Sequence, residues 1–262
     1  GDGRRRHAAG PGQERVTDAA GFRGTIGVVL SSPNTVLERD LWTAAPPGYT
    51  FHAARLLTGA RPLHTDDAIA AVQADLAAAL DIAAAQVRSL DPDHAIVGMS
   101  LAPFEGGRAG HDAFVERLET ALGCPVSTAA GAVAAALSAL GAESVALLTP
   151  LGGRAAQVMA AYFSEAGFAV REVSELAFAT PRAIAGAPRG HVSSALHRLG
   201  AAGADAVVQL GTNLPALDAL ETIEGLLGTP VVGVNGALLW DALRALGDGS
   251  AVHGYGRLLR EH

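Results

Sequence analysis

The stretch Leu122–Val126 (LGCPV) occurs a second time as Leu227–Val231 (LGTPV), and this repeat predicts how the chain folds. In both copies a Gly-Ala pair stands five residues after the valine, at the start of an alanine- and leucine-rich segment. Upstream of each copy, a short apolar run ends in small polar residues, Ala95–Ser100 in the first and Ala206–Asn213 in the second. A single repeat of roughly one hundred residues indicates two related α/β halves that face each other across one small site.

Apolar runs of strand length alternate with segments of helix length through both halves. Thr25–Leu30 is apolar throughout, which is typical of a parallel strand buried on both faces, and Asp66–Leu90 is typical of a long alanine-rich helix. This alternation predicts an α/β fold with a parallel sheet in each half. The segment Phe178–Gly190 contains two prolines and two glycines, so we expect it to be irregular, as a lid or an insertion.

Composition excludes several classes of function. The net charge of −7 argues against a nucleic-acid or anionic-membrane partner, and no uninterrupted apolar run approaches the roughly 18 residues of a membrane span. The chain has no lysine, which excludes Schiff-base chemistry and a P-loop, and its single cysteine excludes a cysteine-rich metal site. No G-x-G-x-x-G stands between a strand and a helix. We therefore expect no cofactor and no metal.

Residues 1–24 are rich in Gly, Arg and Ala and have no hydrophobic periodicity, so they are predicted to form a disordered tail. The run Arg4–Arg6 could belong to a twin-arginine signal, but no apolar segment follows it. A cytoplasmic location is therefore expected.

Small polar residues follow the predicted strands. In parallel α/β sheets, ligands bind beyond the carboxyl ends of the strands. The residues at these ends include no ionised group, which suits a carboxylate or enolate oxygen held by neutral donors. They are Ser31, Ser32, Asn34, Ser100, Ser127, Thr128, Thr149, Thr212, Asn213 and Asn235.

The chain resembles the aspartate/glutamate racemase superfamily, specifically its maleate cis–trans isomerase and arylmalonate decarboxylase branch. The resemblance covers about residues 25–262 and rests on Ser31–Glu38, His52–Arg55, Gly211–Leu214, Val231–Trp240 and Gly254–Leu258. It implies two Rossmann-like α/β/α subdomains related by a pseudo-twofold axis, formed by residues 25–133 plus 237–262 and by residues 134–236. It also implies an active site between them for a small organic acid, no cofactor, and a monomer or homodimer.

Two departures from this family bear on the reaction. The resemblance implies two cysteines facing each other across the substrate, and the corresponding positions hold Met99 and Gly211; Leu151 stands where the family has a tyrosine. Two-base racemisation and thiolate addition to an alkene both need a thiol, so we expect neither a two-cysteine racemase nor a maleate isomerase. Cys124 lies elsewhere in the sequence and is expected to be a buried, inert thiol.

Three residues are candidate proton carriers: Glu38, His52 and Tyr255. Glu38 could equally complete a capping box, and His52 could be a structural histidine, although histidine is well suited to proton transfer. Tyr255 stands between two glycines and could place a phenol over the cleft.

Two function classes stay open. The first is a cofactor-independent lyase or isomerase that decarboxylates, eliminates, cyclises or tautomerises an organic acid through an enolate-like intermediate. The alternative is a non-catalytic carboxylate-binding or regulatory protein on the same scaffold.

Overall fold

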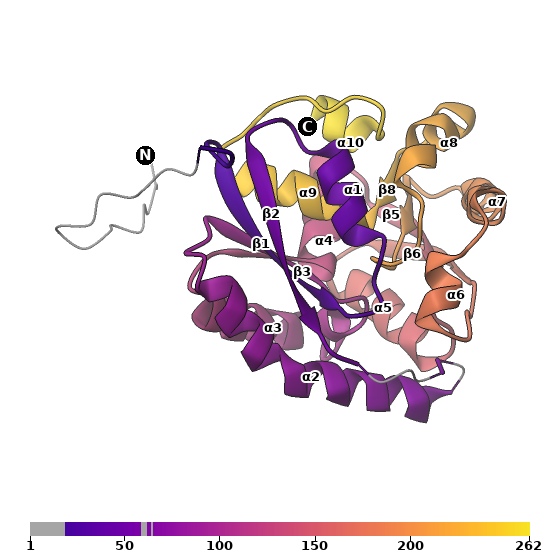
Figure 1. The fold of residues 1–262 in the computed structure, drawn as a ribbon. Coiled ribbons are helices and arrows are strands. Elements are labelled where there is room, and N and C mark those ends of the chain that lie inside the picture. The colour runs from indigo at the N-terminus through magenta and orange to yellow at the C-terminus, as the bar shows by residue number, and fades with distance from the viewer. Residues whose placement is uncertain (1–18, 59–61, 64) are drawn as a thin grey trace.

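The computed structural model describes residues 19–58, 62–63 and 65–262, and Figure 1 shows the arrangement of its helices and strands. The first sheet contains β1 (Gly24–Ser31), β2 (Tyr49–Leu56), β3 (His94–Gly98) and β4 (Val126–Thr128), and the second contains β5 (Ser144–Thr149), β6 (Ala169–Glu175), β7 (Ala206–Gln209) and β8 (Val231–Gly233). The α-helices are α1 (Leu37–Ala44), α2 (Asp66–Arg88), α3 (Gly107–Leu122), α4 (Ala129–Ala139), α5 (Arg154–Glu165), α6 (Pro181–Ala185), α7 (Arg189–Leu199), α8 (Leu220–Leu227), α9 (Val234–Ala245) and α10 (Arg257–Glu261).

Both sheets are parallel and have the same strand order. The first runs β2-β1-β3-β4 and the second β6-β5-β7-β8, and every pairing within them is parallel. The central strands are the ones predicted from continuous apolar runs, and Val28, Leu147 and Val207 within them are fully buried. Helices cover both faces of each sheet, which is why these strands are apolar on both sides (Figure 1). The predicted α/β fold with two four-stranded parallel sheets is confirmed.

The repeated stretch occupies the same place in each half. Gly123 ends α3 and Gly228 ends α8, with φ of 74° and 69° in the left-handed region that glycine adopts readily at a helix end. The carbonyls of Pro125 and Pro230 then accept hydrogen bonds from β3 and β7 at 2.9 Å. The sequence repeat is therefore a structural repeat of one helix–turn–strand unit.

Helix α9 connects the two halves. It follows β8 of the second sheet, but it also contacts β3 and β4 of the first sheet and packs against α4 (Figure 1). The packing of a late helix on the early sheet agrees with a division into residues 25–133 plus 237–262 and residues 134–236, which stays a prediction.

Two expectations differ from the structure. The fold begins before Thr25, because Gly24 belongs to β1 and Arg23 hydrogen-bonds Ser250 at 3.0 Å; residues 1–18 of the expected tail lie outside the described residues. The segment Phe178–Gly190 is not irregular throughout, because it holds α6 and the start of α7. Thr180 caps α6 by accepting a hydrogen bond from the Ala183 N–H at 3.1 Å. Pro181 begins α6 and Gly186 ends it, so the prolines and glycines of this segment stand at helix ends.

The long helix α2, along the lower edge of Figure 1, has the length and mean hydropathy of a membrane span. No uninterrupted apolar run marks this helix in the sequence, because Asp75 and Asp81 lie within it. Its Ile69, Leu76 and Leu80 are buried, and the helix contacts β1, β2 and α3. These residues form one buried face of α2 that packs on the first sheet.

Candidate functional site

A pocket of about 80 Å³ lies where the carboxyl ends of the two sheets meet. Its wall combines the segments that follow β1, β3, β5 and β7 with one face of α2 and part of α6. The lining residues are Ser31, Pro33, Thr58, Leu63, Ile69, Val72, Gln73, Leu76, Gly98, Met99, Ser100, Pro150, Leu151, Pro181, Ile184 and Asn213. Five residues predicted from the sequence are thus brought together here: Ser31, Met99, Ser100, Leu151 and Asn213.

The strand ends supply hydrogen-bond donors that the protein itself does not use up. Among the described residues, the Ser31 hydroxyl has no hydrogen-bond partner. Ser100 Oγ accepts the Thr212 N–H at 3.3 Å, while the Thr212 hydroxyl donates to the Gly98 carbonyl at 3.1 Å. The Ser100 hydroxyl proton is therefore free to bond either Thr212 Oγ1 or a ligand.

Asn213 holds two neighbouring segments in place beside this pocket. Its Oδ1 accepts the Thr35 N–H at 3.0 Å and its Nδ2 donates to the Pro181 carbonyl at 2.9 Å. An amide NH₂ carries two hydrogens, so one N–H of Asn213 remains for a ligand. Ser31, Ser100 and Asn213 are thus three neutral residues of the pocket lining that can each donate a hydrogen bond to a ligand.

No ionisable side chain lines the pocket in the part of the chain that the structure describes. The single cysteine, Cys124, is buried in the apolar cluster that includes Leu118 and Leu122, and it is not part of the pocket lining. Burial raises the pKa of the Cys124 thiol to about 12, which keeps it protonated and weakly nucleophilic. The expectation that Cys124 is buried is confirmed, and the inertness of its thiol stays a prediction.

Asn34, predicted from the sequence to bind the substrate, lies outside the pocket lining. Its Nδ2 donates to Thr212 Oγ1 at 3.1 Å, and its Oδ1 accepts the N–H groups of Val36 and Leu37 at 3.0 Å each. The side chain is 1% exposed. Asn34 joins the two halves and holds the start of α1, and, unlike Asn213, it is not part of the pocket lining.

Asn235 also lies behind the pocket wall. Its Nδ2 donates to Asp40 Oδ2 at 2.8 Å and to the Thr212 carbonyl at 3.1 Å. Burial raises the pKa of Asp40, and hydrogen bonds from Asn235 and Arg39 oppose that rise. Asn235 therefore stabilises a buried carboxyl group. It was predicted to bind the substrate, but it is not part of the pocket lining.

Four further sequence predictions lie beside the pocket, outside its lining. Ser32 accepts the Thr58 N–H at 3.2 Å, and Thr149 accepts the Leu151 N–H at 3.1 Å, so both hydroxyls shape turns. Thr212 contacts only protein groups, as described above. Gly211 has φ of 112°, and a Cβ atom built there would lie 2.5 Å from Pro150 Cγ. A cysteine at Gly211 would therefore require the backbone or Pro150 to move.

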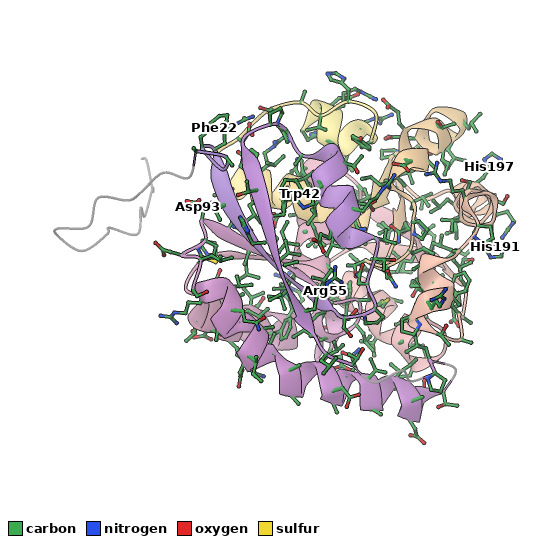
Figure 2. All side chains as sticks on the ribbon, viewed as in Figure 1. Phe22, Trp42, Arg55, Asp93, His191 and His197 are labelled. Carbon is green, nitrogen blue, oxygen red and sulfur yellow. The ribbon has the colours of Figure 1, made fainter. Side chains whose placement is uncertain are left out.

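None of the three candidate proton carriers reaches the pocket. Glu38 forms an ion pair with Arg55, a residue labelled in Figure 2, and Arg55 also donates to the Asn34 carbonyl at 2.7 Å. His52 lies within the edge strand β2, with Nε2 3.1 Å from Thr50 Oγ1. The Tyr255 hydroxyl donates to the Thr43 carbonyl at 3.3 Å, at the end of α1. The expected catalytic roles of Glu38, His52 and Tyr255 are not supported, because local partners hold each side chain elsewhere.

One wall of the pocket, provided by α2, was not predicted from the sequence. Ile69, Val72, Gln73 and Leu76 follow the i, i+3, i+4, i+7 spacing of one helical face, and all four line the pocket. That periodicity was visible in the sequence. The sequence did not show that this face of α2 lies opposite the strand ends of both halves.

A buried Ser–His–Asp cluster occurs outside the pocket. His94 Nε2 lies 2.8 Å from Ser127 Oγ, and Ser127 donates to Asp241 Oδ2 at 2.6 Å. Serine bridges the other two groups, whereas a catalytic triad needs histidine in the middle. Burial lowers the pKa of His94 to about 4, so the imidazole is neutral at physiological pH. This cluster is a structural network between the first sheet and α9.

A second cavity, of about 190 Å³, lies beside α1 and α7. Its lining includes Arg39, Arg189 and Asp218. The Asp218 carboxylate accepts a hydrogen bond from Arg39 at 2.6 Å and another from Arg189 at 2.8 Å. The two cations are therefore already paired with an anion of the protein.

Comparisons with known proteins agree with this architecture. The family model described as arylmalonate decarboxylase matches residues 47–259. Maleate isomerase of Nocardia farcinica is 30% identical over 248 residues, covering 90% of this chain and 95% of its own length. Arylmalonate decarboxylase of Bordetella bronchiseptica is 31% identical over 240 residues, covering 90% and 97%.

A solved structure extends the match to three dimensions. It is a variant of Nocardia farcinica maleate cis–trans isomerase with a covalently bound succinylcysteine intermediate. It superposes with a TM-score of 0.81 at 27% identity, covering 91% of this chain and 98% of that one. The chain therefore belongs to the arylmalonate decarboxylase family, within the maleate isomerase and arylmalonate decarboxylase branch of the aspartate/glutamate racemase superfamily.

Proposed function

We propose that this protein is a cofactor-independent lyase or isomerase that acts on a small organic acid without a catalytic thiol. Its relatives are an isomerase of maleate and a decarboxylase of arylmalonate, so an enzyme of this superfamily acting on an organic acid is the starting point. The observation that carries the proposal is the pocket itself: free neutral donors at the strand ends, apolar walls, and no ionisable lining side chain among the described residues.

This set of groups suits an enolate-like intermediate. The Ser31 and Ser100 hydroxyls and the remaining N–H of Asn213 can hold a carboxylate and then stabilise the charge that gathers on its oxygens as the enolate forms. A preorganised donor of this kind contributes about 2.7–4 kcal/mol to a transition state. The apolar wall lowers the polarity around these donors, which strengthens each of their hydrogen bonds.

The proposed reaction differs from that of the thiol-dependent relative. In the Nocardia farcinica isomerase variant, the intermediate is covalently attached to a cysteine. Here Cys124 lies outside the pocket and its thiol stays protonated. We therefore propose decarboxylation, elimination, cyclisation or tautomerisation, and not maleate isomerisation by thiolate addition.

A ligand screen followed by product analysis tests this proposal. Maleate, malonate and phenylmalonate are tested for a thermal shift, and each acid that stabilises the protein is incubated and followed by NMR. The Cys124→Ala variant is assayed in parallel. We expect at least one acid to bind and to be converted at the same rate by both proteins. Loss of turnover in a folded Cys124→Ala variant would overturn the thiol-free mechanism.

The second candidate is a carboxylate-binding or regulatory protein that lacks chemistry. The observation that favours it is the position of Glu38, His52 and Tyr255, all of which lie away from the pocket. An acid that raises the melting temperature of the protein but is not converted to any product would favour this second candidate. A monomer or homodimer in the cytoplasm, with no nucleic-acid or membrane partner, stays a prediction.

A further inference from the structure

The face of α2 that lines the pocket is apolar except at one position. Ile69, Val72 and Leu76 present aliphatic side chains, and Gln73 stands among them. The Gln73 Oε1 atom is buried and has no hydrogen-bond partner among the described residues. Its Nε2 likewise donates to none of them. An amide therefore faces the pocket with its hydrogen-bonding capacity unused.

A buried amide oxygen without a partner, such as Gln73 Oε1, carries a free-energy cost, because the atom loses its water without gaining a hydrogen bond. A buried glutamine elsewhere in the protein avoids that cost: Gln209 donates from Nε2 to the carbonyls of Leu210 and Gly211 at 3.1 Å and 3.0 Å. The two glutamines differ in location, since Gln209 is buried in the protein interior and Gln73 lines the pocket. The missing partner of Gln73 is therefore best supplied by the molecule that fills this cavity.

We propose that Gln73 is a specificity-determining residue, whose amide hydrogen-bonds a hydroxyl group on the apolar substituent of the substrate. The inference rests on the proposed function, in which Ser31, Ser100 and Asn213 bind the acid group from the strand ends. The rest of the substrate then lies against α2. A hydroxyl both donates and accepts a hydrogen bond, so it satisfies the amide in either orientation of its oxygen and nitrogen.

This arrangement predicts discrimination between otherwise similar acids. An acid with an unsubstituted phenyl group leaves the Gln73 amide unpaired, whereas a hydroxyphenyl acid with the hydroxyl in reach satisfies it. We expect at least one hydroxyphenylmalonate to bind about tenfold tighter than phenylmalonate, because a buried polar group left unpaired costs at least that much affinity.

The experiment measures the affinities of phenylmalonate and its 2-, 3- and 4-hydroxy derivatives by calorimetry. Wild type is compared with Gln73→Met, which keeps the length of the side chain and removes its polar atoms. The matched control is Gln86→Met, since Gln86 lies on the exposed side of the same helix. We expect Gln73→Met to lose the preference for the hydroxylated acid and to bind phenylmalonate at least as well as wild type. Gln86→Met keeps the preference.

Thermal unfolding of the free proteins gives an independent reading. Replacing an amide whose buried oxygen has no partner by an apolar group leaves the melting temperature unchanged or raises it, whereas removal of a structural hydrogen bond would lower it. A preference that persists in Gln73→Met, or the absence of any preference in a wild type that binds phenylmalonate, overturns the role of Gln73 and leaves the proposed function standing. If none of the four acids binds wild type, the role of Gln73 fails, and binding and turnover of maleate or malonate then decide the proposed function separately.

Discussion

The two cavities lie on either side of one hydrogen bond and have opposite chemistry. The Thr35 N–H donates to Asn213 Oδ1 at 3.0 Å; Asn213 lines the pocket at the strand ends, and Thr35 lines the cavity beside α1 and α7. The pocket holds neutral donors with unused hydrogen bonds. The larger cavity is lined by Arg39 and Arg189, and both guanidinium groups form ion pairs with Asp218.

This contrast shows that charge alone does not mark an anion site. Guanidinium groups paired with a carboxylate have little left to offer a ligand, and an exposed pair contributes little energy. Neutral hydroxyls in an apolar wall are more useful to a developing oxyanion, because they are free and because little water competes with them. The following predictions test the contrast by altering each cavity and the residues between them.

The largest effect is expected at Ser100. The Ser100→Ala substitution removes a donor from the pocket and should lower kcat by about 10²–10³-fold for the acid that the protein converts. Steady-state kinetics measures the change. Ser193→Ala is the matched control, because Ser193 lines the charged cavity and its removal should leave kcat unchanged. Equal losses in both variants would contradict the assignment of chemistry to the strand ends.

Asn34 joins the halves and should matter for stability. The Asn34→Ala substitution removes the cap of α1 and the bond to Thr212, and it should lower the free energy of unfolding by about 2–3 kcal/mol. Denaturant titration measures this loss. If Asn34→Ala kept its stability and lost only ligand affinity, Asn34 would be a ligand and not a structural connection.

Asp40 gives a pH-dependent effect because it lies between the charged cavity and the buried network. Its folded-state pKa is raised above the unfolded value, so its contribution to stability is greatest below the unfolded pKa and is lost as pH rises through the folded pKa. The unfolding free energy of wild type relative to Asp40→Asn should therefore decrease from about pH 3 to pH 7. Denaturant titrations across this range measure it, and an increase with pH would contradict the raised pKa.

The smallest effect is expected at Arg189. Its side chain is 73% exposed, and its ion pair with Asp218 is duplicated by Arg39. The Arg189→Ala substitution should change the free energy of unfolding by less than about 1 kcal/mol and leave activity unaltered. A large loss of activity would show that the charged cavity takes part in function.

The sequence predicted the sheets better than it predicted the site. Continuous apolar runs marked the central strands, and the repeat of Leu122–Val126 at Leu227–Val231 marked the same turn in both halves, because burial and left-handed turns restrict local residue choice. The strand ends were also located correctly. At those ends the sequence could not separate Ser100, which keeps a free hydroxyl, from Asn34, whose polar atoms bond neighbouring protein groups.

By itself, the sequence determined a twofold α/β chain with its small polar residues at the carboxyl ends of parallel strands and its single thiol away from them. Only the tertiary structure decided which of those polar groups remain free, and that a face of α2 with Gln73 completes the wall. The physical reason is that strand and helix periodicity are local properties of the chain. The satisfaction of a hydrogen bond depends on partners brought together from distant segments, as Asn34 and Thr212 are, 178 residues apart.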